Sequence, residues 1–147
     1  MQRQDARIDG FYRTMIILWF AILFTVVLFF LLSVFVLKAE GTRNDILTIV
    51  FSALGTLFVI ASFLVKQKYL QRAVDTQRIE LVQTGHIIAW SMCEFSALLG
   101  LLDSLLTSNR YHFLLFVIGA IGVAAHFPRR DQLLAATYKT SSNGAVS

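Results

Sequence analysis

Long apolar runs alternate with short polar connections along the chain. The apolar runs occupy 14–37, 46–65, 81–106 and 111–127, and polar residues fill 38–45, 66–80 and 107–110 between them. The first run has 24 residues and no charge, and as a helix of about 36 Å it exceeds the roughly 30 Å of a bilayer's hydrocarbon core. The pattern therefore predicts an all-α fold, a bundle of four transmembrane helices.

Polar segments frame this transmembrane domain of 14–127. The segment 1–13 precedes it and the tail 128–147 follows it. Since no small-residue cleavage site follows a short apolar core, we expect the first run to be an uncleaved signal anchor. Proline cannot continue a helix, so the fourth run is expected to end at Pro128. The tail closes with Ser141-Ser142-Asn143-Gly144 and is expected to be disordered.

Basic residues divide unequally between the two sides of a four-span protein. The segments 1–13, 66–80 and 128–147 carry three, four and three Lys or Arg residues, ten in all, whereas the other side has three, Lys38, Arg43 and Arg110. An excess of Lys and Arg in short loops marks the cytoplasmic side. We therefore expect both termini and the 66–80 connection to be cytoplasmic, in the inner (plasma) membrane of a bacterium.

Composition supports the membrane class. Hydrophobic residues make up 56% of the chain and charged residues 15%, with a mean hydropathy of +0.67. The net charge of +4 would suit a nucleic-acid-binding protein, but the basic residues lie between apolar runs instead of clustering on one face, so no nucleic-acid partner is expected. Cys93 is the only cysteine, which excludes an intramolecular disulfide and a cysteine metal site.

Small side chains recur on one face of three of the predicted helices. In the second span Thr48, Ser52 and Thr56 follow one another every four residues, beside Gly55. The third span carries Gly85, Ala89, Cys93, Ser96, Gly100 and Ser104, and the fourth carries Gly119, Ala120, Gly122, Ala124 and Ala125. Small residues at helical spacing let membrane helices approach closely. We expect each strip to contact another helix, in this chain or in a partner.

The third span also contains a carboxylate, Glu94, near its middle. Glu94 lies 14 residues after Glu80 and 12 before Leu106, about 18 to 21 Å from either end of the helix. A charge at that depth costs on the order of 2.5 to 3.5 kcal/mol, so Glu94 is expected to face other helices or water. At about 100° per residue, Gln83 lies on the same side of the helix as Glu94, and His86 lies about 80° away.

Two interpretations of this group are open. Glu94, with Gln83 and His86, is a candidate site for binding an ion or a proton, as intramembrane acids often are. Alternatively, Glu94 is a protonated carboxyl that forms a hydrogen bond across a pair of helices, and His86 is a polar contact near the cytoplasmic end of the span.

Other distinctive residues indicate structural roles. Asp103 lies about 13.5 Å beyond Glu94 and about 180° around the helix, so we expect it near the outer interface. Trp90 and Cys93 are expected to be packed inside the bundle. His112 and His126 stand at opposite ends of the fourth span, so no metal site is predicted.

The residues Glu94-Phe95-Ser96-Ala97-Leu98-Leu99-Gly100-Leu101 resemble the ion-binding helix of the c-type proteolipid subunits of rotary ATPases. In that family the carboxylate is followed at similar spacing by Ala, two apolar residues, Gly and Leu, and the hairpin layout of 46–106 is similar too. The resemblance implies that Glu94 carries a proton or a sodium ion, with Arg72 and Arg78 in the cytoplasmic loop. The chain departs from the family in having Gly55 alone where the family has a run of glycines, and in having a first and a fourth helix.

The sequence has none of the familiar patterns of enzymes. It has no paired nucleophile and base, no phosphate-binding loop and no cofactor fingerprint, so we expect neither catalysis nor a cofactor. The sequence favours a small integral membrane protein that is a non-enzymatic partner or accessory subunit of a membrane assembly, contacting the lipid bilayer and other membrane helices in a homo-oligomer or a larger complex. The alternative is a proton- or ion-binding, proteolipid-like membrane protein that uses Glu94.

Overall fold

The structure of the protein, a computed structural model, describes residues 2–35, 44–107 and 110–138, and these residues form an all-helical protein. The helices are α1 (Gln2–Phe35), α2 (Asp45–Thr76), α3 (Ile79–Leu106), the 3-10 helix η1 (Arg110–His112), α4 (Phe113–Ala125) and α5 (Arg130–Thr137). No strand occurs in the described ranges, which confirms the predicted all-α class. Most of the predicted 38–45 connection and the end of the tail lie outside them.

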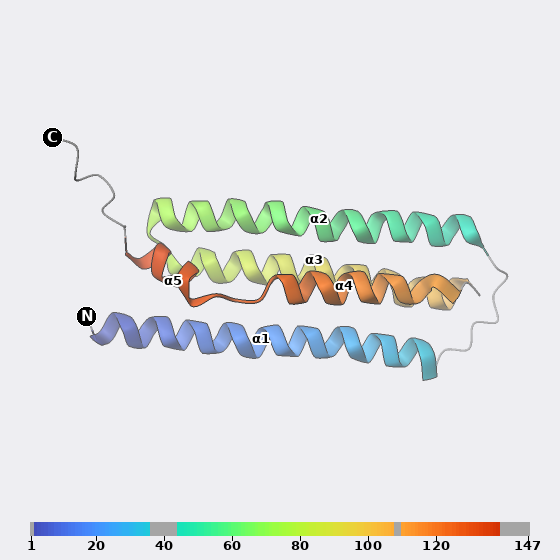
Figure 1. Cartoon of the computed structure of the whole chain (residues 1–147), viewed down its shortest axis with the longest axis horizontal. Helices are drawn as coiled ribbons and strands as arrows, with labels where there is room; N and C mark the ends of the chain where they lie inside the picture. The colour runs from blue at the N-terminus through green and yellow to red at the C-terminus, as the bar shows by residue number, and fades with distance from the viewer. Residues whose placement is uncertain (1, 36–43, 108–109, 139–147) are drawn as a thin grey trace.

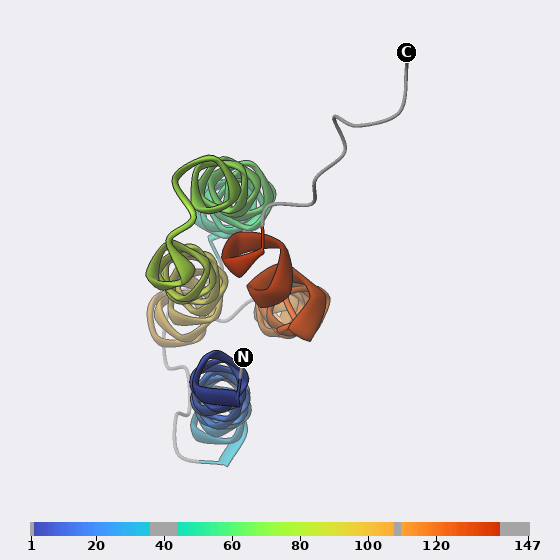
Figure 2. The ribbon, with the colours of Figure 1, turned by 90° about the vertical axis from the view of Figure 1, so that its left-hand side faces the viewer.

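The helices form an elongated bundle in which α3 and α4 lie between α1 and α2 (Figures 1 and 2). The start of α1, the α2–α3 turn and α5 gather at one end, called here the α5 end; η1 and the start of α2 lie at the other, the far end (Figure 1). Helix α3 contacts every other α-helix, and half of its most apolar stretch is buried, against 11% for α1 and 17% for α2. The third span is therefore the centre of the bundle.

Capping contacts and backbone conformation set the ends of α2 and the start of α3. The side chain of Asn44 caps α2 by accepting a hydrogen bond from the backbone N–H of Leu47, which would otherwise have no partner in the first turn. At the other end Gln77 adopts a left-handed conformation with φ 52°, and α3 starts two residues later. The polar 66–80 stretch, which has neither Pro nor Gly, thus continues both helices and joins them by a tight turn.

Three helices, α1, α2 and α3, are long and apolar enough to cross a membrane, and a fourth crossing arises if α4 and α5 together form one bent span. Large apolar side chains cover the outside of the bundle, as at Phe24, which is 68% exposed, and Leu64, which is 66% exposed. An apolar surface of this extent suits hydrocarbon better than water. The fold thus supports a membrane protein with three or four spans.

The strip of small residues predicted on the third span is confirmed as a packed face. Gly85, Ala89, Cys93, Ser96, Gly100 and Ser104 are all buried. The closest approach involves the fourth span, because a Cβ atom added to Gly119 would lie 2.9 Å from the backbone oxygen of Cys93. Backbone cannot move aside as a flexible side chain can, so this position requires glycine.

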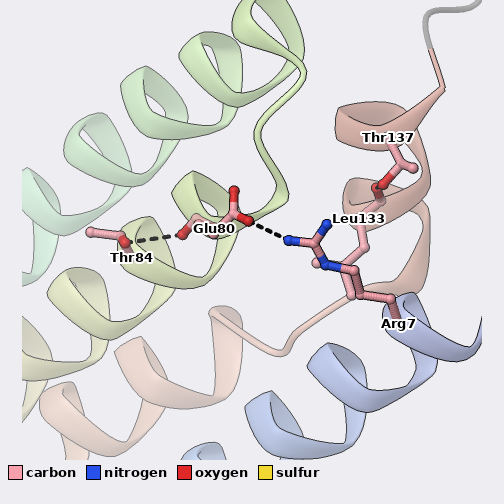
Figure 3. A network of polar contacts seen from close by, with 5 residues as sticks. All are labelled: Arg7, Glu80, Thr84, Leu133 and Thr137. Carbon is pink, nitrogen blue, oxygen red and sulfur yellow. Dashed lines mark hydrogen bonds and ion pairs between the residues drawn. The ribbon is translucent and has the colours of Figure 1, made fainter. Parts of the chain in front are cut away.

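Helix α5 was not predicted from the sequence, where 128–147 was expected to be a tail. Its buried residues Leu133 and Ala136 face the bundle and close the α5 end. Two ion pairs lie at this end. The Arg130 guanidinium of α5 lies 2.8 Å from the Asp9 carboxylate of α1, and the Arg7 guanidinium of α1 lies 2.6 Å from Glu80 of α3, beside α5 (Figure 3). These ion pairs are exposed, so the apolar contacts of α5 contribute more to its position.

We predict that Gly119→Ala lowers the free energy of unfolding by about 1 to 3 kcal/mol, because the new methyl group meets the Cys93 backbone. Gly10→Ala is the matched control: Gly10 is helical, and a Cβ atom added there would meet nothing within 4 Å, so the change is neutral or gains up to about 1 kcal/mol of helix propensity. Reversible unfolding of both variants in mixed detergent micelles measures the difference. Equal stability of the two variants would contradict the close α3–α4 contact.

Candidate functional site

The fourth span is broken. Helix α4 ends at Ala125, α5 starts at Arg130, and the two helices are bent by 48° across the four residues between them. With 13 residues, α4 is about 20 Å long, too short to cross a hydrocarbon core of about 30 Å. The predicted span 111–127 is therefore not a continuous crossing helix, and Pro128, which cannot continue a helix, lies in the break.

The break lies at mid-height of the bundle. Its neighbours are Trp19 of α1, Ser62 of α2 and Cys93 of α3, and each lies within two residues of the midpoint of its helix. Non-helical backbone at membrane depth is tolerated where protein covers it or where it lines a polar cavity. In several transporter folds such discontinuous helices form the binding site. The break is therefore the first candidate functional site.

Two tryptophans supply hydrogen bonds to the backbone at the break. The indole N–H of Trp19 donates to the Val123 carbonyl at 2.8 Å, and that of Trp90 donates to the His126 carbonyl at 3.1 Å. A carbonyl left without a donor in an apolar interior costs about 1 to 3 kcal/mol. The Trp90 indole thus satisfies the His126 carbonyl, whereas the Val123 carbonyl also accepts from the backbone N–H of His126 at 3.1 Å. Trp90, predicted to be packed, is fully buried.

His126, the first residue of the break, is fully buried and pairs with α2. Its Nε2 lies 2.7 Å from the Ser62 hydroxyl, and its ring packs 4.3 Å from that of Phe63. The same hydroxyl donates to the Val59 carbonyl at 2.6 Å and lies 3.5 Å from the Cys93 sulfur. Helices α2, α3 and the break are therefore connected by one buried polar chain.

His86 lies about one helical turn from Trp90, toward the α5 end. It is fully buried, its Nδ1 lies 2.9 Å from the Val82 carbonyl, and its ring is 5.5 Å from the Trp90 ring. Lys66 of α2 is 8% exposed and makes no hydrogen bond or ion pair with another residue in the described ranges. Two imidazoles and a buried ammonium therefore share this part of the bundle without a carboxylate.

Glu94 lies on a different face of α3. It is only partly buried, and within the described part of the chain no hydrogen bond or ion pair reaches it. Its neighbours Phe95 and Leu98 are exposed. Gln83 is also partly buried, but it is 11 residues away, about 16.5 Å along the helix, and His86 points into the bundle. The structure therefore does not bring together the three residues proposed as an ion site.

Asp103 forms a separate polar group at the far end. It is fully buried, and its Oδ1 accepts hydrogen bonds from the hydroxyls of Thr48 and Thr107, both at 2.9 Å. It was expected near the outer interface, and it does lie three residues before the end of α3, but it faces α2 instead of the surface. In the described ranges, no three His, Cys, Asp or Glu side chains gather as a metal site would require.

Sequence reasoning missed the residues that α2 and α5 contribute at the break. Ser62 gives no signal because it is an isolated polar residue in an apolar run, and Lys66 and Gln132 give none because each stands among other polar residues. A signal did exist at His126, where an unusually short apolar run stops at a proline. Short or interrupted spans of this kind indicate broken helices.

We predict that Ser62→Ala lowers the free energy of unfolding by about 1 to 3 kcal/mol, since the buried His126 ring loses its partner. Ser91→Ala, at an exposed position of α3, is the control and is expected to stay within about 0.5 kcal/mol of the parent. Detergent-titration unfolding compares the two. A Ser62→Ala protein as stable as Ser91→Ala would show that the contact with His126 contributes nothing.

Comparison of the chain with protein-family models, curated proteins and solved structures finds no match. The similarity of 46–106 to the proteolipid hairpin thus stays a prediction from the sequence, and function is inferred from the geometry of Glu94 and of the broken helix.

Proposed function

We propose that the protein is an integral membrane protein that serves as a non-enzymatic subunit of a larger membrane assembly, with the Glu94 face of α3 as its contact surface. The observation that carries this proposal is a carboxyl group near the midpoint of a membrane-length helix, partly exposed and without a partner in the described part of the chain. A side chain of this kind is expected to face protein or water, not lipid.

The energetics favour a covering helix over lipid. A charged carboxylate facing hydrocarbon costs on the order of 2.5 to 3.5 kcal/mol, and a protonated one still lacks its hydrogen bonds. Around Glu94 the exposed side chains Phe95, Leu98 and Leu102 are apolar, so the surface suits a membrane helix that brings one polar group to meet the carboxyl. The partner is either a second copy of the chain or a helix of another subunit.

A second uncovered surface on α2 agrees with a subunit role. The small-residue ridge predicted there is only partly used within the chain: Thr48 and Gly55 are buried, whereas Ser52 and Thr56 line an open groove of about 760 Å³. Small side chains beside an apolar groove permit close approach of another helix.

In this proposal the α5 end is cytoplasmic and the far end is on the opposite side of an inner (plasma) membrane. The basic residues Arg7, Arg72 and Arg130 all belong to the α5 end, as the bias of Lys and Arg toward cytoplasmic loops requires. The start of α1 and the whole of α5 lie together there, which is consistent with an even number of crossings.

The alternative proposal is that Glu94 carries an ion or a proton, as the likeness to proteolipid subunits implies. A carboxyl exposed on the outside of a bundle would meet its ion at an interface with a neighbouring subunit. Both proposals therefore need a partner at α3, and they differ in whether Glu94 exchanges a proton.

We predict that benzoylphenylalanine in place of Phe95 gives a covalent adduct of higher mass when the native membrane is illuminated, because the side chain lies beside Glu94 on the contact face. The same replacement at Phe24, 68% exposed on α1, is the matched control for contact with lipid. Gel mobility and mass spectrometry identify the adduct. A protein that is strictly monomeric in mild detergent and gives no adduct at Phe95 rules out the subunit role.

We predict for the alternative that a carbodiimide modifies Glu94 increasingly as the pH falls, since the reagent attacks the protonated carboxyl. Peptide mapping locates the adduct, and Glu94→Gln removes it. Asp103, buried and bonded to two hydroxyls, is the internal control and stays unmodified. Full retention of ion binding or conductance in Glu94→Gln would exclude an ion-carrying role.

A further inference from the structure

Three buried hydrogen-bond acceptors lie at or beside the break without a donor. They are Nε2 of His86, Nδ1 of His126 and Oε1 of Gln132, and none has a hydrogen-bond partner in the described ranges. Both histidines are 0% exposed. Each unmet acceptor in an apolar interior costs about 1 to 3 kcal/mol. A group that donates hydrogen bonds is therefore expected at this place.

The bonds that the two imidazoles do make determine which nitrogen holds the lone pair. The Val82 carbonyl can only accept, so Nδ1 of His86 bears the proton and Nε2 is bare. The single hydrogen of Ser62 goes to the Val59 carbonyl, so its oxygen accepts from Nε2 of His126 and leaves Nδ1 bare. Both rings are neutral in this arrangement, and each presents a basic nitrogen.

The surrounding groups restrict what can bind. Lys66 of α2 acts electrostatically on both rings, Arg129 at the start of α5 acts on Lys66, and Cys93 of α3 touches the Ser62 hydroxyl. Helix α1 contributes the indole of Trp19. No carboxylate in the described ranges bonds to any of these groups. A metal cation would meet positive charge with no acid to offset it. A proton meets the same charge, but it needs no cavity and gains a covalent N–H bond.

Gln132 gives the proton a second ligand. Its side chain lies beside His86, and its Oε1 is one of the three unmet acceptors. When Nε2 of His86 gains a proton, the new N–H donates to that oxygen, so one proton satisfies two acceptors. A pocket of about 150 Å³ at the α5 end includes Ile79 in its lining, about 10.5 Å along α3 from His86. Protons thus have a short distance to travel from the α5 end.

We propose that the broken fourth span contains a proton-binding site, in which His86 takes up a proton on Nε2 and shares it with Gln132 of α5. The site is independent of Glu94 and of the subunit contact. The site fills as the pH falls. The Lys66 charge opposes a second positive charge nearby, so the proton binds only at acidic pH. Its occupancy links the acidity at the α5 end to the position of α5 through the new hydrogen bond.

The fluorescence of Trp90 tests the proposal, because a protonated imidazole quenches an indole in contact with it by accepting an electron. The chain has two tryptophans, so Trp19→Phe leaves Trp90 as the single emitter, 5.5 Å from the His86 ring. In lipid nanodiscs we expect at least an about twofold loss of emission between about pH 8 and about pH 3, a range wide enough to protonate a buried histidine that lies near the charge of Lys66. His86→Gln abolishes the loss, and His112→Gln at the far end of α4 retains it.

Two further variants separate proton binding from a structural role. Gln132→Leu moves the midpoint to lower pH, because the second ligand of the proton is lost. Lys66→Met moves it to higher pH, because the opposing charge is removed, and Lys66→Arg leaves it in place. Emission that does not change with pH, quenching that survives His86→Gln, or a midpoint unaffected by Gln132→Leu overturns the proposal.

A second measurement needs no substitution. In the wild-type protein labelled with nitrogen-15 histidine, the ring nitrogens of the three histidines report their own protonation. We expect Nε2 of His86 to change from a bare to a protonated nitrogen on acidification. If the His86 ring keeps one bare nitrogen down to about pH 3, far below the pH at which an ordinary histidine takes up a proton, the proposal is overturned.

Discussion

The hydrogen-bonding demand of backbone carbonyls determines how this bundle can be built. Where α4 stops at mid-height, the indole of Trp90 from α3 donates to the carbonyl of His126. The indole of Trp19 from α1 adds a second donor to the carbonyl of Val123, which also accepts from the His126 backbone N–H. Each indole–carbonyl hydrogen bond restricts how far one long helix, α1 or α3, can slide along its axis relative to the break. In a continuous fourth helix the His126 carbonyl would accept from the backbone and would not need the Trp90 indole.

Helix α3 carries two polar features on different faces, and they have different physical roles. Toward the interior, His86 and the small-residue strip contact α2, α4 and α5, and polar groups there are protected from lipid. Toward the outside, Glu94 lies among apolar side chains and has no partner in the described part of the chain. The inner face therefore carries the polar contacts within the chain, whereas the outer face is the one that we propose contacts other membrane helices.

Prediction from the sequence succeeded where a long run of residues repeats one pattern of apolar or small side chains. The apolar runs gave the helices, and the strip from Gly85 to Ser104 gave the packed face of α3. It failed for α5, because a helix of eight residues is too short to show a clear periodic pattern of apolar positions. It also failed for the candidate site, because the pairing of His126 with Ser62 joins residues 64 positions apart.

The sequence alone therefore determined the helical class, the presence of helices of membrane length and the position of Glu94 near the midpoint of one of them, since each depends on local composition and on the fixed rise of a helix. Only the tertiary structure decided which polar groups meet. It separated Glu94 from His86, although they lie eight residues apart on one helix, and it brought His86, His126, Lys66 and Gln132 to one region of the bundle. The reason is physical: the rotation and register of packed helices depend on contacts between distant segments, which no local pattern contains.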